Sequence, residues 1–447
     1  MVTHAVRPHQ VKELIARGEL AELTDLIATM PPGEIAAVGN RLPRRQASIA
    51  FRLLPKDVAL QVFEDLSPKV QYRLIEQLGT SEVGEFFGSL DPDDRAELLD
   101  ELPAPVAHDL VASLERSERE ATGLVLGFPA GSVGRRMSPE IVHAYTDDSA
   151  AAALDRVTEV GHQVETIYMV PVVDRDHVLA GVVSLRDLLL ADPDTLLSSL
   201  MRTPISAAAS DDAEQTALLC VERGILAIPV LDSERHVIGV FTLDDAVEVM
   251  SQARDEDQAR AGASEPLNEP YLVASVLSIT RSRIVWLFVL AVSAILTVNV
   301  LEIFEATLDQ MVALALFIPL LTGIGGNTGS QAAVTVTRAL AVDEVSPRDV
   351  AIVVGKELRV GLTLGVLLGL VGFGVASLAY DMDIGAVIGL TILSICTMAA
   401  TVGGVMPLIA KSIGVDPAVF STPFISTFCD ATGLIIYFSI AKAVLGI

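Results

Sequence analysis

Asp430 stands alone in a long apolar stretch near the C-terminus, and no other residue has a clearer chemical meaning. It is the only formally charged residue in the stretch FISTFCDATGLIIYFSIA. A charged carboxylate in the middle of a membrane costs about 2.5 to 3.5 kcal/mol on insertion scales, so it persists where water, a partner group or an ion receives it. Helical spacing places Asp430 on one face with Thr422, Ser426 and Gly433, which predicts a polar stripe.

A second polar stripe is predicted in the apolar segment that contains IPLLTGIGGNTGSQ. Helical spacing places its polar residues on one face, directly after three glycines: Asn327, Gln331, Thr335 and Arg338 after Gly323, Gly325 and Gly326. The glycines permit a broken helix or a closely packed one. Two stripes in two membrane helices predict a single hydrated interior, although small polar residues also serve as ordinary helix contacts.

The stripes favour a cation pathway. An ion pair of Asp430 with Arg338 or Lys442 is the structural alternative, but these two residues lie near helix ends, where long basic side chains extend to the interface. An anion pore would need basic groups or helix N-termini, and the stripes offer none. Mg²⁺ is usually bound through one or two carboxylates with several waters retained, which suits one Asp per chain in a symmetric dimer. Spacing alone does not separate Mg²⁺ from other divalent ions.

Charge divides the 447 residues near position 270. Residues 271–447 hold 8 Lys and Arg against 11 Asp and Glu, whereas residues 1–270 hold 23 against 46. The C-terminal part contains five charge-poor stretches of about the length that crosses a bilayer, near 284–301, 310–337, 360–380, 384–410 and 417–441. Basic residues gather between the second and third stretches, which predicts a cytosolic N-terminus and an outer C-terminus in the cell membrane. The N-terminal residues lack a signal peptide's apolar run.

The acidic N-terminal part favours cations as partners and disfavours nucleic acid. The whole chain has a net charge of −26 and three cysteines with no close pair, which argues against a disulfide framework or a thiolate zinc site. No nucleophile with a base, phosphate-binding loop or closed set of metal ligands is recognisable, so an enzyme is not expected.

Two internal repeats organise the acidic part. The phrases LLPKD, LSPKV, LGTSE, LDPDD and LPAPV recur about every 12 residues between 53 and 106 and predict short stacked helices. Farther on, VPVVDRDHVLAGVVSLRDL and IPVLDSERHVIGVFTLDDA align without gaps at an offset of 58 residues. Each predicts strand, turn, strand and helix, so two α/β units should pack as a pair. The polar stretch from Leu243 to about Arg260 predicts one helix running toward the membrane.

The whole chain resembles the MgtE family of magnesium transporters, and its α/β units resemble tandem CBS domains. The most specific segments are IPLLTGIGGNTGSQ and GVDPAVFSTPFISTFCDATGLIIYFSIAK. The resemblance implies an all-α solenoid-like domain (1–130), two α/β CBS domains (131–200 and 201–250), a connecting helix with its linker (243–272) and an all-α membrane domain of five helices (273–447). It also implies a homodimer within membrane lipid, and a sensing role for the CBS pair.

The resemblance assigns candidate site residues by position. It implies a pore ion site at Asp430, Asn327, Thr422, Ser426 and Gly433, with Thr422 standing where relatives often have Asn. It implies regulatory Mg²⁺ ligands at Asp93, Glu97, Asp212, Glu214, Asp245, Glu248, Glu256 and Asp257. Gln61 and Gly224 stand where the family can carry acids, so fewer regulatory sites are expected. Arg186 and Asp187 match the segment that binds an adenine nucleotide such as ATP.

Three functions therefore compete. The favoured one is a Mg²⁺-gated Mg²⁺ channel, in which cytosolic Mg²⁺ joins mutually repelling carboxylates and so favours a compact, closed state. The second is a secondary carrier coupled to protons or Na⁺, with Asp430 binding the coupling ion. The third is a membrane-anchored nucleotide sensor without transport, which leaves the two polar stripes unexplained.

Overall fold

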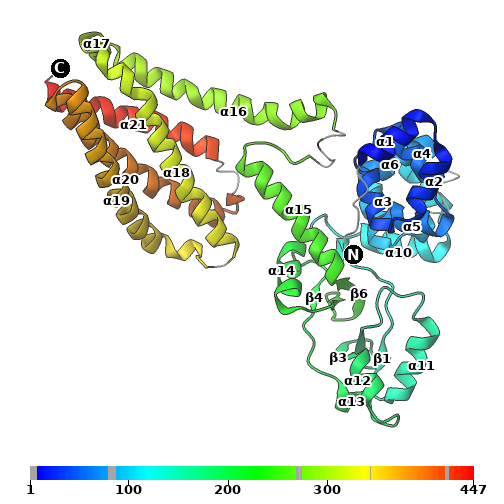
Figure 1. Cartoon of the computed structure of the whole chain (residues 1–447). Coiled ribbons are helices and arrows are strands. Elements are labelled where there is room, and N and C mark those ends of the chain that lie inside the picture. Colours follow the sequence, from blue (N-terminus) through cyan, green and yellow to red (C-terminus); the bar gives the residue numbers. More distant parts are fainter. Residues whose placement is uncertain are drawn as a thin grey trace. The chain divides into compact units, whose positions relative to one another are not determined.

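The computed structural model describes residues 8–78, 87–267, 271, 274–342, 344–417 and 422–446. The chain forms two compact units, each considered by itself below. The first comprises residues 1–253 and 268–274, and the second comprises 254–267 and 275–447 (Figure 1). These units do not coincide with the predicted domain boundaries, because the predicted connecting helix contributes residues to both. The boundaries themselves stay predictions.

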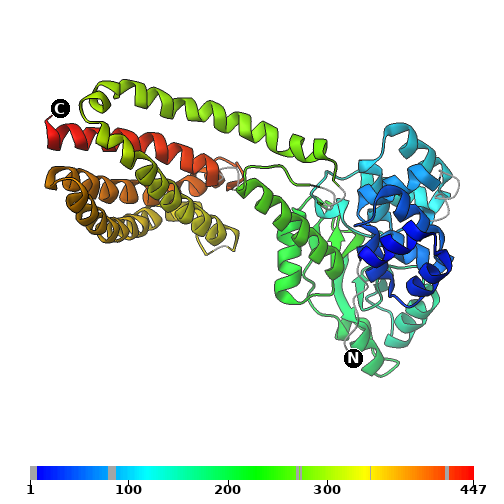
Figure 2. The same cartoon turned by 45° about the horizontal axis from the view of Figure 1, so that its top comes forward.

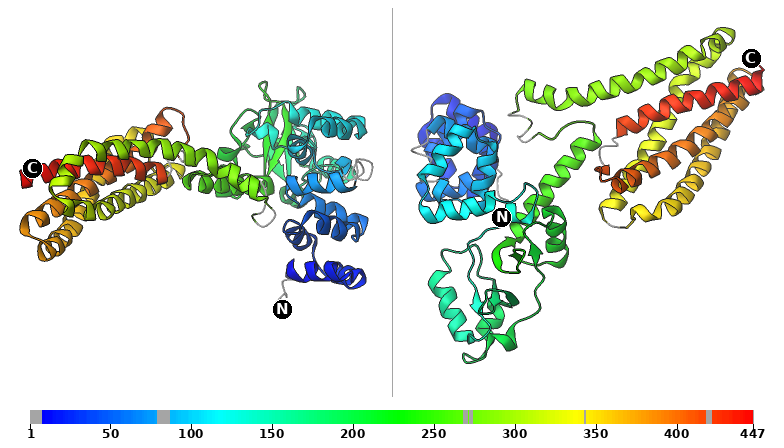
Figure 3. Two further views of the ribbon diagram at one scale, coloured as in Figure 1. Left: turned by 90° about the horizontal axis from the view of Figure 1, so that it is seen from above. Right: turned by 180° about the vertical axis from the view of Figure 1, so that it is seen from behind.

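The first unit begins with a stack of short helices, as the 12-residue repeat predicts (Figure 3). Their bounds are α1 (Pro8–Arg17), α2 (Leu20–Ala28), α3 (Pro32–Gly39), α4 (Arg44–Arg52), α5 (Lys56–Glu64), α6 (Pro68–Leu78), α8 (Pro92–Glu101), α9 (Ala104–Ser113) and α10 (Arg116–Leu126). Prolines stand at or next to the N-termini of most of these helices, where their missing N–H costs no hydrogen bond. Most of the LGTSE repeat lies outside the described residues.

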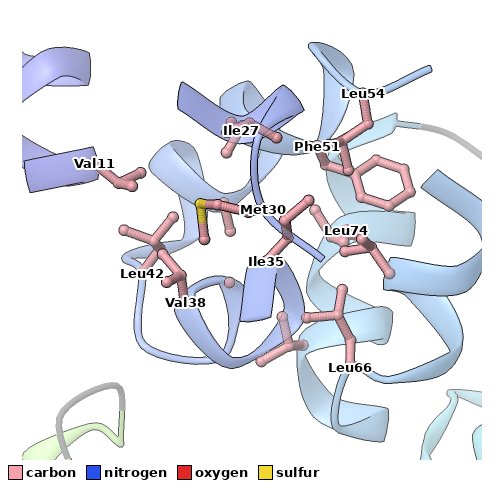
Figure 4. A pocket seen from close by; sticks show the side chains of 15 residues that line it. Val11, Ile27, Met30, Ile35, Val38, Leu42, Phe51, Leu54, Leu66 and Leu74 are labelled. Carbon is pink, nitrogen blue, oxygen red and sulfur yellow. The ribbon is translucent and has the colours of Figure 1, made fainter. Parts of the chain in front are cut away.

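The helical domain has one continuous apolar core. A cavity of about 20 Å³ lies within it and is lined by side chains such as Val11, Met30, Phe51 and Leu74 (Figure 4). This space is close to that of a single water molecule, and the apolar lining would give a water no hydrogen-bond partners. The helical domain is therefore a packed scaffold at this point, and its functional groups lie on its surface.

The two α/β units repeat one another in detail. Each forms a three-stranded sheet with its first strand parallel to the second and its second antiparallel to the third. The first α/β unit contains β1 (Ala144–Tyr145), α11 (Ala150–Val160), β2 (Met169–Val173), β3 (Leu179–Ser184), α12 (Leu185–Leu190) and α13 (Leu197–Leu200). The second contains β4 (Ala207–Ala208), α14 (Ala213–Arg223), β5 (Ala227–Leu231), β6 (Val237–Thr242) and α15 (Leu243–Ala261). Even the register shifts, at Val172/Val173 and Val230/Leu231, are 58 residues apart.

Reciprocal strand contacts join the α/β units into a pair. Ser138, which precedes the first unit's strands, bridges to Val240 on β6, and Arg202 bridges to Val182 on β3. The two acidic turns also meet, since the N–H of Leu179 donates to the Arg235 carbonyl at 3.2 Å. The prediction that the units pack across their strands is confirmed.

The second compact unit contains five helical segments long and apolar enough to cross a membrane, counted over the described residues, and the five predicted stretches are confirmed. The membrane-length segments are α16 (Val276–Ile303), η2 (Val312–Phe317) with α18 (Ile318–Ala341), η3 (Pro347–Asp349) with α19 (Val350–Ala379), α20 (Met382–Ser412) and α21 (Thr422–Leu445). The short helix α17 (Glu305–Gln310) follows α16, and the first compact unit contains a further 3₁₀ turn, η1 (Val133–Arg135). Figure 2 shows α16 running beside α21, and α19 and α20 forming a long antiparallel pair.

Glycines set how closely these membrane helices approach one another. A Cβ added at Gly403 on α20 would overlap the backbone of Gly329 on α18, and one at Gly361 on α19 would lie 2.7 Å from the Cys396 carbonyl oxygen. Small residues let helix backbones approach closely where lipid supplies no hydrophobic driving force. Helix α18 is continuous, so the alternative of a broken helix is excluded. Gly325 and Gly326 are closely packed, whereas a Cβ at Gly323 would meet nothing within 4 Å.

Gly403→Ala should destabilise the membrane unit by about 1 to 3 kcal/mol, the usual cost of overpacking a filled interior. Gly374→Ala is the matched control, since a Cβ there meets nothing within 4 Å. Thermal unfolding of the full chain in detergent, followed through its single tryptophan, Trp286, measures the difference. Equal midpoints for the two variants would contradict close packing at Gly403.

Candidate functional site

The two predicted polar stripes lie on neighbouring helices, α18 and α21. Ser426 of α21 faces Gly326, at which any added Cβ would collide with the serine hydroxyl. The Ser330 hydroxyl on α18 donates to the Thr422 carbonyl at 3.2 Å. Because no side chain stands between the helices at Gly326, α18 and α21 lie in direct contact there, and together they form part of the surface of the membrane unit.

Asp430 lies partly exposed on this surface. Within the described part of the chain, its carboxylate makes no hydrogen bond and no ion pair, so neither Arg338 nor Lys442 neutralises it there. The Lys442 ammonium instead lies 5.3 Å from the centre of the Phe304 ring. The structural alternative considered for Asp430, pairing with a basic group, is absent from the described residues.

The polar stripe of α18 is also uncovered in the single chain, since Asn327, Gln331, Thr335 and Arg338 are all exposed. Thr422 and Ser426 are half-buried at the contact with α18. Gly433 differs from the other predicted pore residues. It is buried, and a Cβ there would lie 3.2 Å from Ile395 of α20, so this glycine packs against α20 in the single chain, and a pore role for it stays a prediction.

A second group of functional side chains lies in the first compact unit, where α8 of the helical domain meets the α/β pair and the start of α15. Its carboxylates interact electrostatically with one another, and we call them the acidic cluster: Asp91, Asp93, Asp94, Glu97, Glu140, Glu165, Asp244, Asp245 and Glu248. The structure thus brings together four of the predicted regulatory ligands: Asp93, Glu97, Asp245 and Glu248. The sequence prediction missed the other five members.

Crowding changes the acidity of the cluster. Burial raises the pKa of Asp94 to about 8, with a further rise from the charges of Asp91 and Glu248. Burial likewise raises the pKa of Glu165 to about 8 and that of Asp245 to about 6. The pKa of Asp93 is also raised well above its ordinary value, by burial first and then by Asp245. Carboxylates gathered away from water hold their protons more tightly because the charged form is poorly solvated.

Basic residues that the sequence prediction missed hold two acids of α8 in place: Glu97 of the cluster, and Asp100 outside it. Arg136 donates from Nη1 to Glu97 Oε2 at 2.7 Å and from Nη2 to Gln252 Oε1 at 2.7 Å. Its neighbour Arg135 donates from Nη2 to both carboxylate oxygens of Asp100 at 2.6 Å. The sequence contains a signal for these pairs, namely two adjacent arginines, Arg135 and Arg136, in a chain with an acidic helix at α8. Only the fold shows which acids the arginines reach.

Two more predicted regulatory ligands belong to α14. Asp212 is the N-cap of this helix, and its Oδ1 accepts a hydrogen bond from the Gln215 N–H at 2.9 Å. Glu214 is exposed on the first turn. Asp212 therefore has a local structural role, and a regulatory role for these two residues stays a prediction.

The candidate nucleotide residues lie at the start of α12. Arg186 is exposed, and Asp187 pairs with Arg202 across 3.0 Å. Tyr168, just before β2, leaves 64% of its surface exposed, and Leu226 takes the same position in the second α/β unit with 55% exposed. An exposed aromatic ring beside a carboxylate can contact a base and a ribose, and the sequence prediction did not include Tyr168 or Arg202.

The last two predicted regulatory ligands, Glu256 and Asp257, belong to the second compact unit. Arg260 joins Glu256 at 2.9 Å and Asp416 at 2.5 Å. Asp416 lies in the segment between α20 and α21, so this arginine connects the end of α15 to the segment that leads into α21. The predicted ligands are thus divided among three places: the acidic cluster with Arg136, the start of α14, and the end of α15 with Arg260.

Oxygen-only donors fit Mg²⁺ or Ca²⁺, the hard cations that carboxylates bind in proteins. No three side chains among His, Cys, Asp and Glu converge closely enough to hold a metal, over the residues that the structure describes. The acidic cluster therefore fits a hydrated ion by its donor chemistry, and direct ligation would need side-chain rotation.

These features define a multi-pass membrane protein that carries an α/β CBS pair and a helical domain rich in carboxylates. A family model described as a divalent cation transporter matches residues 318–440, one for the MgtE intracellular N domain matches 30–131, and one for the CBS domain matches 130–194 and 197–252. The chain belongs to the MgtE family.

Individual relatives agree over nearly the full length. The chain is 32% identical to the magnesium transporter MgtE of Thermus thermophilus, across 97% of this chain and 98% of the relative. It is 28% identical to the magnesium transporter MgtE of Bacillus subtilis, across 96% and 95%. A crystal structure of the cytosolic domain of the Mg²⁺ channel MgtE in complex with ATP aligns with a TM-score of 0.50 and 27% identity, covering 55% of this chain and 100% of that one.

The contact between α8 and the α/β pair should strengthen as pH falls in the absence of divalent ions. Raised pKa values mean that the clustered acids keep protons which separated acids would lose, so the contact is stabilised as pH falls from about 8 toward about 4. Fluorescence energy transfer between labels at His108→Cys and Asp176→Cys, both exposed positions, measures the contact. Combining Asp94→Asn with Glu165→Gln should flatten the pH response, and an unchanged response would contradict the assignment.

The Arg260–Asp416 pair should hold the end of α15 against the segment between α20 and α21. Arg260→Gln should speed amide exchange in residues 254–267 of the full chain by about two- to fivefold, the size expected for a partly exposed ion pair. Asp416→Asn should do the same, and the double variant should add little. Arg254→Gln, on the same helix, is the control. Additive effects of the two substitutions would show that the pair does not act as a unit.

Proposed function

We propose that this protein conducts Mg²⁺ across the cell membrane through a path lined by α18 and α21, with Asp430 at its centre. The observation that carries the proposal is the carboxylate of Asp430, which lies on an uncovered polar surface of a membrane unit without a basic partner among the described residues. A membrane carboxylate of this kind needs water or a cation. Names of the near full-length relatives support Mg²⁺ as the cargo.

The proposed path recognises a hydrated ion. Mg²⁺ loses its waters reluctantly and is commonly held by one or two carboxylates while it keeps several of them. In the proposed path, Asn327, Thr422 and Ser426 would supply amide and hydroxyl oxygens that contact those waters, together with the carboxylate of Asp430. Weak contacts through water suit conduction, because an ion that binds too tightly would not leave.

A homodimer would complete the path. The polar stripe of α18 is exposed in one chain, and polar residues at membrane depth are expected to face a bundle interior or a water-filled cavity. Two copies facing each other across α18 and α21 would enclose the stripes and place two Asp430 carboxylates at one site. The charges of the connecting loops support a cytosolic position for the helical domain and an outer position for the C-terminus.

The acidic cluster would sense cytosolic Mg²⁺. Its carboxylates repel one another at close range, and a divalent ion converts this repulsion into attraction, so bound Mg²⁺ favours the arrangement in which α8 contacts the α/β pair. The continuous helix α15 contains Asp245 and Glu248 of this cluster and, farther along, Glu256, Asp257 and Arg260. A rigid helix of this kind would carry the sensed state toward the segment before α21 and close the path.

An adenine nucleotide would bind at the CBS pair through Arg186 and Asp187. Support comes from the similar cytosolic domain of the Mg²⁺ channel MgtE, whose crystal structure is a complex with ATP. Asp187 is engaged with Arg202, so nucleotide binding here would replace or share an existing ion pair.

The proton- or Na⁺-coupled carrier gains no support from the comparisons. The relatives are named magnesium transporters, and a solved relative is described as a channel. Transport that stops when a proton or Na⁺ gradient is removed would nevertheless restore this alternative.

Asp430→Asn should reduce Mg²⁺ flux at least about tenfold, because the amide keeps the shape but removes the charge that stabilises the ion. Flux is measured with the full chain in liposomes containing a Mg²⁺-sensitive dye, without any other ion gradient. Asp383→Asn, an exposed acid on the first turn of α20, is the matched control and should transport normally. Normal flux through the Asp430→Asn variant would remove Asp430 from the path.

A further inference from the structure

Arg136 lies where three parts of the first compact unit meet. It follows the 3₁₀ turn η1 and extends to Glu97 on α8 and to Gln252 on α15, with both donor–acceptor distances at 2.7 Å. About three-quarters of the side-chain surface of both Arg136 and Glu97 is buried, since each is 24% exposed. Charge-assisted hydrogen bonds of this kind are roughly twice as strong as neutral ones.

Gln252 closes the network. Its amide nitrogen donates to Glu97 Oε1 at 3.2 Å and to Glu248 Oε1 at 3.2 Å. Both oxygens of Glu97 therefore have donors from this protein, one from Arg136 and one from Gln252. Since Glu97 and Glu248 are two of the acids proposed to sense Mg²⁺, a fixed organic cation already occupies part of the sensing site.

Arg95 is a second cation of this kind. It is 1% exposed, and its Nη1 donates to the Gly88 carbonyl at 2.8 Å. Its Nε and Nη2 have no hydrogen-bond partner among the described residues. The charges of Glu140, Glu118 and Asp91 act on it most strongly. The cluster therefore contains positive charge at two points before any metal binds.

We infer that Arg136 is a resident counter-ion of the Mg²⁺-sensing cluster, which competes with the metal for Glu97 and holds α8 against the α/β pair when Mg²⁺ is scarce. The inference rests on the proposed sensing function. Arg136 would thereby set how much of the compact arrangement depends on the metal. A chain with this arginine keeps part of the contact at low Mg²⁺, whereas a chain without it relies on Mg²⁺ alone.

The physical basis is the number of positive charges that the clustered carboxylates require. Close like charges destabilise the contact, and each neighbouring cation offsets part of that repulsion. Arg136 is tethered and always charged, so its contribution does not depend on ion concentration. Mg²⁺ contributes more charge, but only in proportion to its occupancy. Removing the arginine therefore weakens the metal-free contact while it frees Glu97 for the metal.

The test compares the full-length wild type with Arg136→Gln by energy transfer between labels at His108→Cys and Asp176→Cys, in a titration with MgCl₂. Without Mg²⁺, the ratio of compact to separated molecules should fall about five- to tenfold in the variant, as for the loss of a partly buried charged hydrogen bond. Saturating Mg²⁺ should restore the wild-type value. Arg136→Lys keeps the charge but loses the paired N–H donors of the guanidinium. Without Mg²⁺, its ratio of compact to separated molecules should lie between those of the wild type and Arg136→Gln.

Two results would overturn the inference. One is an Arg136→Gln variant with the same ratio of compact to separated molecules as the wild type without Mg²⁺. The other is a ratio lowered by the same factor at every Mg²⁺ concentration, which would indicate that Arg136 has a structural role independent of the metal. Circular dichroism checks that the variants fold, and Arg136→Lys provides the comparison if the glutamine variant does not. A wild type that shows no Mg²⁺ response would refute the proposed sensing function, while the metal-free comparison would still decide the role of Arg136.

Discussion

Repulsion between carboxylates that are held close together, partly away from water, is the constraint that shapes the first compact unit. Acids on α8, on the segments around Glu140 and Glu165, and at the start of α15 raise one another's pKa values. Such an arrangement is stable only when protons, arginines or metal ions supply positive charge. The same energetic cost that makes the cluster a poor structural contact makes it responsive to cations.

The membrane unit meets a related constraint at Asp430, the one acid of α21. Glycines on α18, α19 and α20 let the helix backbones approach closely, so the unit packs without large side chains at these crossings. The polar face of α18 and Asp430 on α21 remain uncovered in one chain. In lipid, such groups are costly unless water, an ion or a second copy meets them. On α18, the small residues that pack against neighbouring helices and the exposed polar residues therefore lie on different faces.

Helix α15 contains charged residues of two groups on one continuous backbone, the acidic cluster near its start and the Arg260–Asp416 pair near its end. Asp245 and Glu248 near its start belong to the acidic cluster, while Arg260 near its end pairs with Asp416 before α21. Asp245, Glu248 and Arg260 lie on one continuous helix of 19 residues, and the charges of the arginines at both places do not depend on ion concentration.

The sequence by itself determined the spans, the two repeats and the paired α/β units, and it singled out Asp430 as a candidate ion-binding residue, because these depend on local periodicity and on the cost of charge in an apolar run. It also indicated four members of the acidic cluster. Only the tertiary structure decided which acids meet, that Glu97 and Asp416 already have arginine partners, and that Gly433 faces Ile395. Such pairings join residues up to 156 positions apart, and their energies depend on distance and burial, which no local pattern encodes.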